Sequence, residues 1–187
     1  MRRSKGRLFK YKETFKITKN YKNIFKNALL ISELLYYSKL MNKNYIFSQI
    51  KSILNKDLPL ISNLSNASAV LNQLENINWC GFYLVKGDKL FLGPFQGEPA
   101  CTVIPFGKGV CRTAFKEKRT IIVKDVSKFE GHIACSAKSK SEIVVPIIKG
   151  NNVIGVIDVD SPVLDRFSDE DKALLEEIAD LLRGFFN

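Results

Sequence analysis

Apolar residues recur every three or four positions in two stretches that follow residue 41. The first stripe contains Phe47, Ile50, Ile53 and Leu54, and the second runs from Leu60 to Leu74 through Leu64, Ala67 and Leu71. This spacing places the apolar side chains on one face of a helix. The sequence therefore predicts two amphipathic helices, which are separated near Pro59.

After these helices the spacing of apolar residues changes to the alternation that is typical of strands, and β-branched residues become frequent. The strand-like segments are 79–85, 90–92, 120–123, 143–148 and 153–159, and two tight turns, 86–88 and 149–152, join neighbouring segments into hairpins. After them, Ser168 precedes three acidic residues and an apolar stripe from Leu174 to Phe185, which predicts a capped final helix. We predict an α+β fold in which helices pack on one side of a mostly antiparallel sheet.

Charge divides the chain near residue 40. Residues 1–40 contain 11 Lys/Arg and 2 Asp/Glu, whereas the other 147 residues contain 18 and 17. We therefore expect a basic N-terminal extension, 1–40, followed by one domain, 41–187. Three interpretations stay open for the extension: a disordered or loosely helical tail, a targeting peptide, and a patch that binds nucleic acid or membrane. For the nearly neutral domain we expect no nucleic-acid partner and, without an apolar run of about 20 residues, no membrane span.

Three of the four cysteines lie in turn-rich stretches between strand-like segments: Cys101, Cys111 and Cys135. Such stretches are usually accessible to solvent and ligands. We expect the protein to be located in the cytoplasm, a reducing compartment where disulfides are mostly transient and catalytic. Cys80, in contrast, lies within an apolar run and is expected in the core. The gaps of 21, 10 and 24 residues and a single histidine, His132, argue against structural zinc. Reactive thiols are the leading hypothesis, and burial as small apolar side chains is the alternative.

Acidic residues interrupt the apolar pattern of the last strand. Asp158 and Asp160 are two residues apart and therefore share a face of the strand, where charge is costly unless something uses it. The hairpin turn at 149–152 brings Glu142 opposite the end of that strand. The three carboxyls are candidates for binding a ligand's ammonium group or for donating a proton, and exposed strand-end charges are the alternative.

Six ordered motifs give the chain a specific resemblance to a known family. They are WCGFY (79–83), GPFQG with PAC (93–97 and 99–101), GKGVC (107–111), GHIAC (131–135), SKSEIVVP (139–146) and IGVIDVD (154–160). Over about residues 42–186 the chain resembles the free methionine-(R)-sulfoxide reductases, which are single-domain enzymes of the GAF fold. The resemblance implies that Cys135 attacks, that Cys101 resolves and that Cys111 is an auxiliary thiol. It also implies that the substrate is bound by Trp79, Tyr83, Glu142, Asp158 and Asp160.

The implied chemistry suits these residue types. A thiolate attacks the sulfoxide sulfur while an acid acts at the oxygen, a sulfenic acid forms on Cys135, and a second thiol converts it to a disulfide that an external dithiol reduces. The family implies thioredoxin as that reductant, a possible homodimer, and no metal or organic cofactor. Two residues depart from the family pattern: Arg112 stands in place of a common glycine and Ser136 in place of a common aspartate. A GAF module that binds a small molecule without turning it over is the alternative function.

Overall fold

The structure is a computed structural model that describes residues 43–104, 109–131 and 137–186. These residues belong to a unit that begins at Lys43, and the proposed basic extension lies outside the described residues. The elements in chain order are a helix over residues 43–53, α2 (Leu60–Leu71), β1 (Trp79–Lys86), β2 (Lys89–Gly97), β3 (Val103–Ile104), α3 (Val110–Glu117), β4 (Ile121–Val123), β5 (Ser141–Lys149), β6 (Asn152–Ser161) and α4 (Asp169–Leu182). Single 3₁₀ turns follow β4 and α4.

The six strands form one sheet in the order β3-β2-β1-β6-β5-β4. Every neighbouring pair is antiparallel, which confirms the predicted α+β class. Both predicted hairpins are present: β1 turns into β2 at Gly87, and β5 turns into β6 at Gly150. Each of these glycines has a positive φ, near +60°, a conformation that glycine adopts without steric cost. The central strands β1 and β6 bring segments 79–84 and 155–160 side by side.

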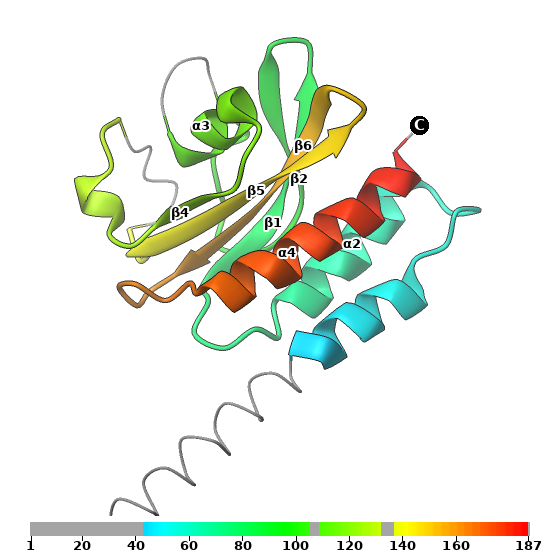
Figure 1. Cartoon of the computed structure of the whole chain (residues 1–187), viewed down its shortest axis with the longest axis horizontal. Coiled ribbons are helices and arrows are strands. Elements are labelled where there is room, and N and C mark those ends of the chain that lie inside the picture. The colour runs from blue at the N-terminus through cyan, green and yellow to red at the C-terminus, as the bar shows by residue number, and fades with distance from the viewer. Residues whose placement is uncertain (1–42, 105–108, 132–136, 187) are drawn as a thin grey trace, which may run out of the picture. The chain divides into compact units, whose positions relative to one another are not determined.

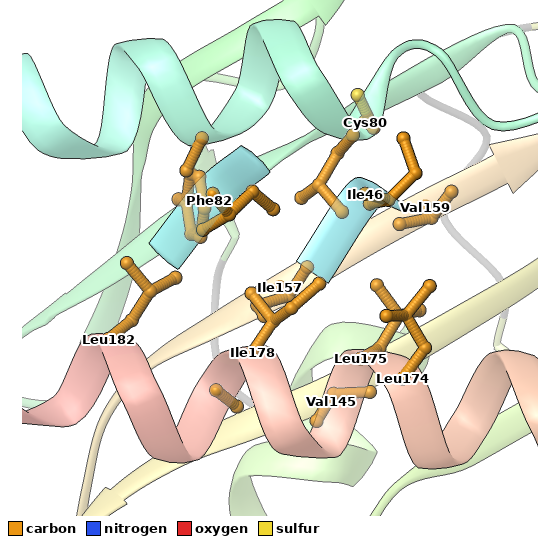
Figure 2. Close-up of a cluster of buried hydrophobic side chains, with 14 of the residues drawn as sticks. Ile46, Cys80, Phe82, Val145, Ile157, Val159, Leu174, Leu175, Ile178 and Leu182 are labelled. Atoms are coloured by element: carbon orange, nitrogen blue, oxygen red, sulfur yellow. The ribbon is translucent and has the colours of Figure 1, made fainter. Parts of the chain in front are cut away.

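The three predicted helices cover one face of the sheet (Figure 1). Figure 2 shows side chains of β1, β5 and β6 meeting those of α4, with Phe82 and Ile157 near Ile178 and Leu182. These four side chains are buried completely, as is Ile46 of the first helix, which the predicted stripe omitted. Burying an aliphatic or aromatic side chain of this size stabilises a fold by roughly 1.5–3 kcal/mol. This face is therefore the structural core.

The opposite face carries a helix that the sequence analysis did not predict. Helix α3 packs there through Val110, Cys111 and Ala114, all buried against apolar side chains of β1, β5 and β6. It begins after Gly109, whose φ of 90° suits a residue without a side chain. The sequence pattern around Cys111 indicated a loop because glycines are typical of turns, and the helix that begins there is only eight residues long. The sheet is consequently covered on both faces, and the second layer is thinner (Figure 1).

Strand β2 is longer than its predicted segment, 90–92. It continues through Gly93, Pro94 and Phe95 to Gly97, a stretch that was expected to be turn-rich. Proline is tolerated there because β3 pairs only with Leu90 and Phe91, so the rest of β2 pairs with β1 alone. The longer strand matters because it places Phe95 beside β1.

Helix α4 begins with the predicted cap. The Ser168 hydroxyl accepts a hydrogen bond from the Asp171 N–H, and the Asp171 carboxylate accepts one from the Ser168 N–H. Asp171 is buried and also forms ion pairs of 3.0 Å with Lys43 and 2.9 Å with Arg166. This carboxylate therefore joins the first helix, the segment before α4 and α4 itself. None of the described helices is both long and apolar enough to cross a membrane.

Gly81, in the middle of β1, provides a test of packing at the second face. A Cβ at this position would lie 2.4 Å from Phe95 Cβ and 2.8 Å from the Trp79 ring. We expect Gly81→Ala to lower the free energy of unfolding by about 1–3 kcal/mol, because the surrounding side chains would have to shift. Gly184→Ala is the control, since a Cβ there meets nothing within 4 Å. Equal urea midpoints for the two variants would show that this part of the sheet accommodates a methyl group.

Candidate functional site

The three predicted carboxyls meet on the second face of the sheet. Glu142 of β5 lies directly opposite Asp160 of β6 in the strand register, and Asp158 is on the same face two residues earlier. They are 6 %, 9 % and 7 % exposed, so the alternative of solvated strand-end charges was wrong. The structure also indicates side-chain hydrogen bonding between Glu142 and Asp158, which requires that one of the two carboxyls keeps a proton.

Burial raises the pKa of each of these carboxyls well above its ordinary value. The negative charge of a neighbour adds to this effect: Asp160 acts on Glu142, Glu142 acts on Asp158, and Asp158 acts on Asp160. Desolvation and like charge both disfavour the ionised form. The cluster is therefore a site that can hold protons near neutral pH, and a cation beside it would stabilise the ionised carboxylates.

Cys111 belongs to this cluster. Its Sγ donates a hydrogen bond of 3.3 Å to Asp158 Oδ2, and the residue is only 3 % exposed. Burial, followed by the charges of Asp158 and Glu142, raises the pKa of the thiol well above its usual range. The expectation of an accessible loop setting was thus wrong for Cys111. The neighbouring Arg112 does not favour a thiolate, because its guanidinium points to the carbonyl of Asp88 and lies over the Phe115 ring.

An aromatic ladder, formed by Trp79, Tyr83 and Phe95, borders the carboxyls. Trp79 lies opposite Asp160 in the register, and its ring stacks on Phe95 at 5.4 Å and on Tyr83 at 6.0 Å between centroids. Trp79 and Tyr83 were predicted, and both are buried. Phe95 was missed because its segment looked like a turn. The alternation of side chains along β2 could have revealed it. Phe95 pairs with Gly81 of β1, so its side chain lies on the same face as Trp79 and Tyr83.

The polar ends of the ladder hold the segment that carries Cys101. The Trp79 Nε1–H donates to the carbonyl of Glu98 at 3.1 Å, and the Tyr83 hydroxyl donates to the carbonyl of Cys101 itself at 3.0 Å. Cys101 is partly buried and disulfide-bonded, in a segment without regular structure, as expected. The same aromatic side chains therefore border the carboxyls and hold the segment that carries the disulfide-bonded Cys101.

The remaining predicted residues divide into two groups. Cys80 is a free thiol, fully buried on the opposite face of the sheet, where its Sγ donates to the carbonyl of Ser68. Its complete burial confirms its assignment to the core, and this burial, followed by the charge of Asp158, raises the pKa of Cys80 to about 12. Cys135, His132 and Ser136 lie outside the described residues.

Three side chains of the site could bind a metal ion. Cys111, Glu142 and Asp158 are the cysteine and carboxylate side chains whose ligand atoms lie within 4.8 Å of one another among the described residues. They provide one sulfur and carboxylate oxygens, which suits a small cation. The arrangement as a whole suits a small polar ligand with an amino group for the carboxyls and an apolar group for the aromatic ladder.

Comparison with known proteins identifies the family of this chain. The model of the GAF domain matches residues 67–183. The free methionine-R-sulfoxide reductase of Escherichia coli is 45% identical over 143 residues, which cover 74% of this chain and 87% of that protein. The yeast reductase of the same name, from Saccharomyces cerevisiae, is 43% identical over 159 residues, which cover 78% of this chain and 88% of that protein.

Solved structures extend the similarity to three dimensions. The reduced form of fRMsr from Staphylococcus aureus superposes with a TM-score of 0.74 at 52% identity, covering 78% of this chain and 96% of that one. The free methionine-R-sulfoxide reductase of Neisseria meningitidis, in complex with its substrate, gives 0.73 at 42% identity, covering 77% and 87%. By the matching family model, these sequence identities and the shared fold, the chain belongs to the GAF-domain family, in the group that includes the free methionine-R-sulfoxide reductases.

Proposed function

We propose that this protein reduces free L-methionine-(R)-sulfoxide to L-methionine by thiol chemistry. The observation that supports this most is the buried cluster of Glu142, Asp158 and Asp160 beside Trp79, because it combines a partner for an ammonium group, a proton donor and an apolar wall. Asp158 would bind the substrate ammonium, and Trp79 and Tyr83 would enclose the methyl group. Glu142 and Asp160, with their raised pKa values, would hydrogen-bond the sulfoxide oxygen and supply the proton.

In this proposal Cys135 is the nucleophile. Its thiolate attacks the sulfoxide sulfur, the S–O bond breaks, and the oxygen ends on Cys135 as a sulfenic acid while methionine leaves. The Cys101 thiol then displaces that oxygen as water, and the two cysteines form a disulfide. A dithiol such as thioredoxin restores both thiols. The reaction requires no metal or organic cofactor.

Two observations support pairing Cys101 with Cys135. Cys101 is disulfide-bonded while Cys80 and Cys111 are free, and Cys135 is the remaining cysteine of the chain. In addition, Lys138, three residues after Cys135, forms an ion pair with Glu98, three residues before Cys101. This ion pair joins two described residues that are each three positions from one of the two cysteines in the sequence. Cys111, protonated and hydrogen-bonded to Asp158, would position this carboxyl rather than make the first attack.

The order of the thiols is tested by single-turnover release of methionine. Cys135→Ser should release none, because a serine hydroxyl cannot accept the oxygen from sulfur. Cys101→Ser should release up to one equivalent and then stall with thioredoxin, since its sulfenic acid has no resolving partner. Cys80→Ser is the matched control and should turn over normally. An undiminished burst from Cys135→Ser would assign the attack to another thiol.

Substrate selectivity tests the role of Asp158. We expect the free R epimer to be favoured over the S epimer, and N-acetylation of the R epimer to cost ~2–5 kcal/mol in transition-state binding, or a factor of tens to thousands in kcat/KM. Asp158→Asn should lose most of the discrimination between the free and the acetylated substrate. Comparable initial rates for all three compounds with the natural protein would mean that the carboxyls do not recognise the amino group. Absence of any turnover would favour a non-catalytic binding module.

Stability as a function of pH tests the raised pKa of Asp158. A carboxyl whose pKa is higher in the folded than in the unfolded protein destabilises the fold increasingly as pH rises above about 4, by up to about 1.4 kcal/mol per pH unit. Between pH 5 and 8, Asp158→Asn should therefore gain stability relative to the natural protein, as measured by urea unfolding.

Asp171→Asn is the matched control, for which we expect the opposite effect on stability between pH 5 and 8. Burial alone would raise the pKa of Asp171, but the Ser168 N–H and the charges of Arg166 and Lys43 outweigh burial and lower it. Asp171 thus stabilises the fold above its unfolded pKa, and the deficit of Asp171→Asn should shrink as the solution is acidified below about pH 4. Parallel stability curves for Asp158→Asn and the natural protein would contradict the assigned shift at Asp158.

A further inference from the structure

One group of side chains at the site has the composition of a metal-binding site. Cys111 from α3, Glu142 from β5 and Asp158 from β6 are brought together by three separate elements. The Cys111 sulfur and one carboxylate oxygen from each of the other two lie within 4.8 Å of one another, and the residues are 3 %, 6 % and 7 % exposed. Because each element is held by the sheet or by the second apolar cluster, the three ligand atoms are positioned before any ion arrives.

A second, independent observation points to a cationic ligand. Asp158 Oδ2 accepts the Cys111 thiol, whereas the buried Asp158 Oδ1 has no hydrogen-bond partner among the described residues once Glu142 and Asp158 are both ionised. A buried acceptor without a partner costs free energy, and for a charged group the cost is larger. An ammonium group or a metal ion at this place would remove that cost.

The ligand set selects the metal. Magnesium and calcium prefer six or more oxygen ligands, whereas zinc accepts one thiolate with carboxylate oxygens in a four-coordinate site. Zinc–sulfur and zinc–oxygen bonds of about 2.3 and 2.1 Å require ligand atoms roughly 3.3–3.6 Å apart. Cys111 Sγ and Asp158 Oδ2 are already 3.3 Å apart. The Glu142 oxygen lies within 4.8 Å of both and would have to approach by at most ~1.5 Å. The fourth position would be left for water.

We propose that Cys111, Glu142 and Asp158 bind one zinc ion, which occupies the substrate site as an inhibitor. Binding releases to solvent the thiol proton and the proton kept by the Glu142–Asp158 pair, so that Cys111 coordinates as thiolate and both acids as carboxylates. No electron is transferred, and only the S–H bond and that carboxyl O–H bond break. The inhibitory part of this inference rests on the proposed function, because the ion would occupy the carboxyls assigned to the ammonium group and the sulfoxide oxygen.

Direct binding is measured with the metal alone, independently of turnover. The full chain is kept oxidised, so that the Cys101 disulfide removes its two sulfurs from competition. Titration with Co²⁺ should produce a thiolate-to-cobalt charge-transfer band that saturates at one ion per chain, and Zn²⁺ should abolish it.

Three variants decide which side chains bind the ion. Cys80→Ser, the matched control on the opposite face of the sheet, should leave the band unchanged. Cys111→Ser should abolish the band, and Glu142→Gln should weaken Zn²⁺ binding in calorimetry by at least ~10-fold. A missing band in the natural protein, or a band that survives in Cys111→Ser, would overturn the proposal. If Cys111→Ser does not fold, unchanged affinity in Glu142→Gln would overturn it equally.

Inhibition is measured on pre-reduced protein in a single turnover without added thiol, because a thiol reductant would chelate the ion. Zn²⁺ should suppress methionine release, and higher concentrations of methionine sulfoxide should restore it. Suppression that excess substrate does not relieve would contradict a shared site. Metal binding without any turnover in the metal-free protein would instead contradict the proposed function and leave the metal site standing.

Discussion

The second face of the sheet depends on the antiparallel register between β5 and β6. That register places Glu142 opposite Asp160 and leaves Asp158 on the same face, two residues along β6. A slip of β6 by one residue would turn Asp158 and Asp160 into the apolar core and move Ile157 and Val159 out of it. The apolar residues of the hairpin therefore fix the position of its acidic ones.

Burying three carboxyls together opposes folding at neutral pH, and the first face offsets this cost. Cys80, Phe82 and Val145 alternate with the site residues along the same strands, and they pack beneath α2 and α4. The two faces of the sheet thus have different roles. The first face stabilises the fold through apolar burial, and the second face holds carboxyls that keep protons at a pH where they would be ionised in water. Because both faces belong to the same strands, stabilising packing on one side fixes the geometry on the other.

The second face is covered by a thin layer, in which aromatic side chains carry hydrogen-bonding groups at their ends. Trp79 and Tyr83 stack over the sheet and donate hydrogen bonds to the carbonyls of Glu98 and Cys101, while α3 contributes Cys111 to Asp158. Gly81 allows the Trp79 ring and Phe95 to approach closely. Aromatic side chains with a hydrogen-bonding end can be buried and still bind backbone groups. They therefore link the acidic cluster to the segment that carries the disulfide-bonded Cys101.

The sequence by itself determined the larger elements of this protein, because period and turn chemistry are local properties. It predicted three of the helices, both hairpins, the shared face of Asp158 and Asp160 and the approach of Glu142. It did not predict α3 or the full length of β2, since the glycines and the proline in these segments are typical of turns, and only packing against β1, β5 and β6 made the segments regular. Nor could it predict that Cys111 is buried against Asp158, or that Phe95 stacks on Trp79. Those contacts join residues far apart in the chain, and only the tertiary structure decides them, because the free energy of such contacts comes from burial between elements and not from the local chain.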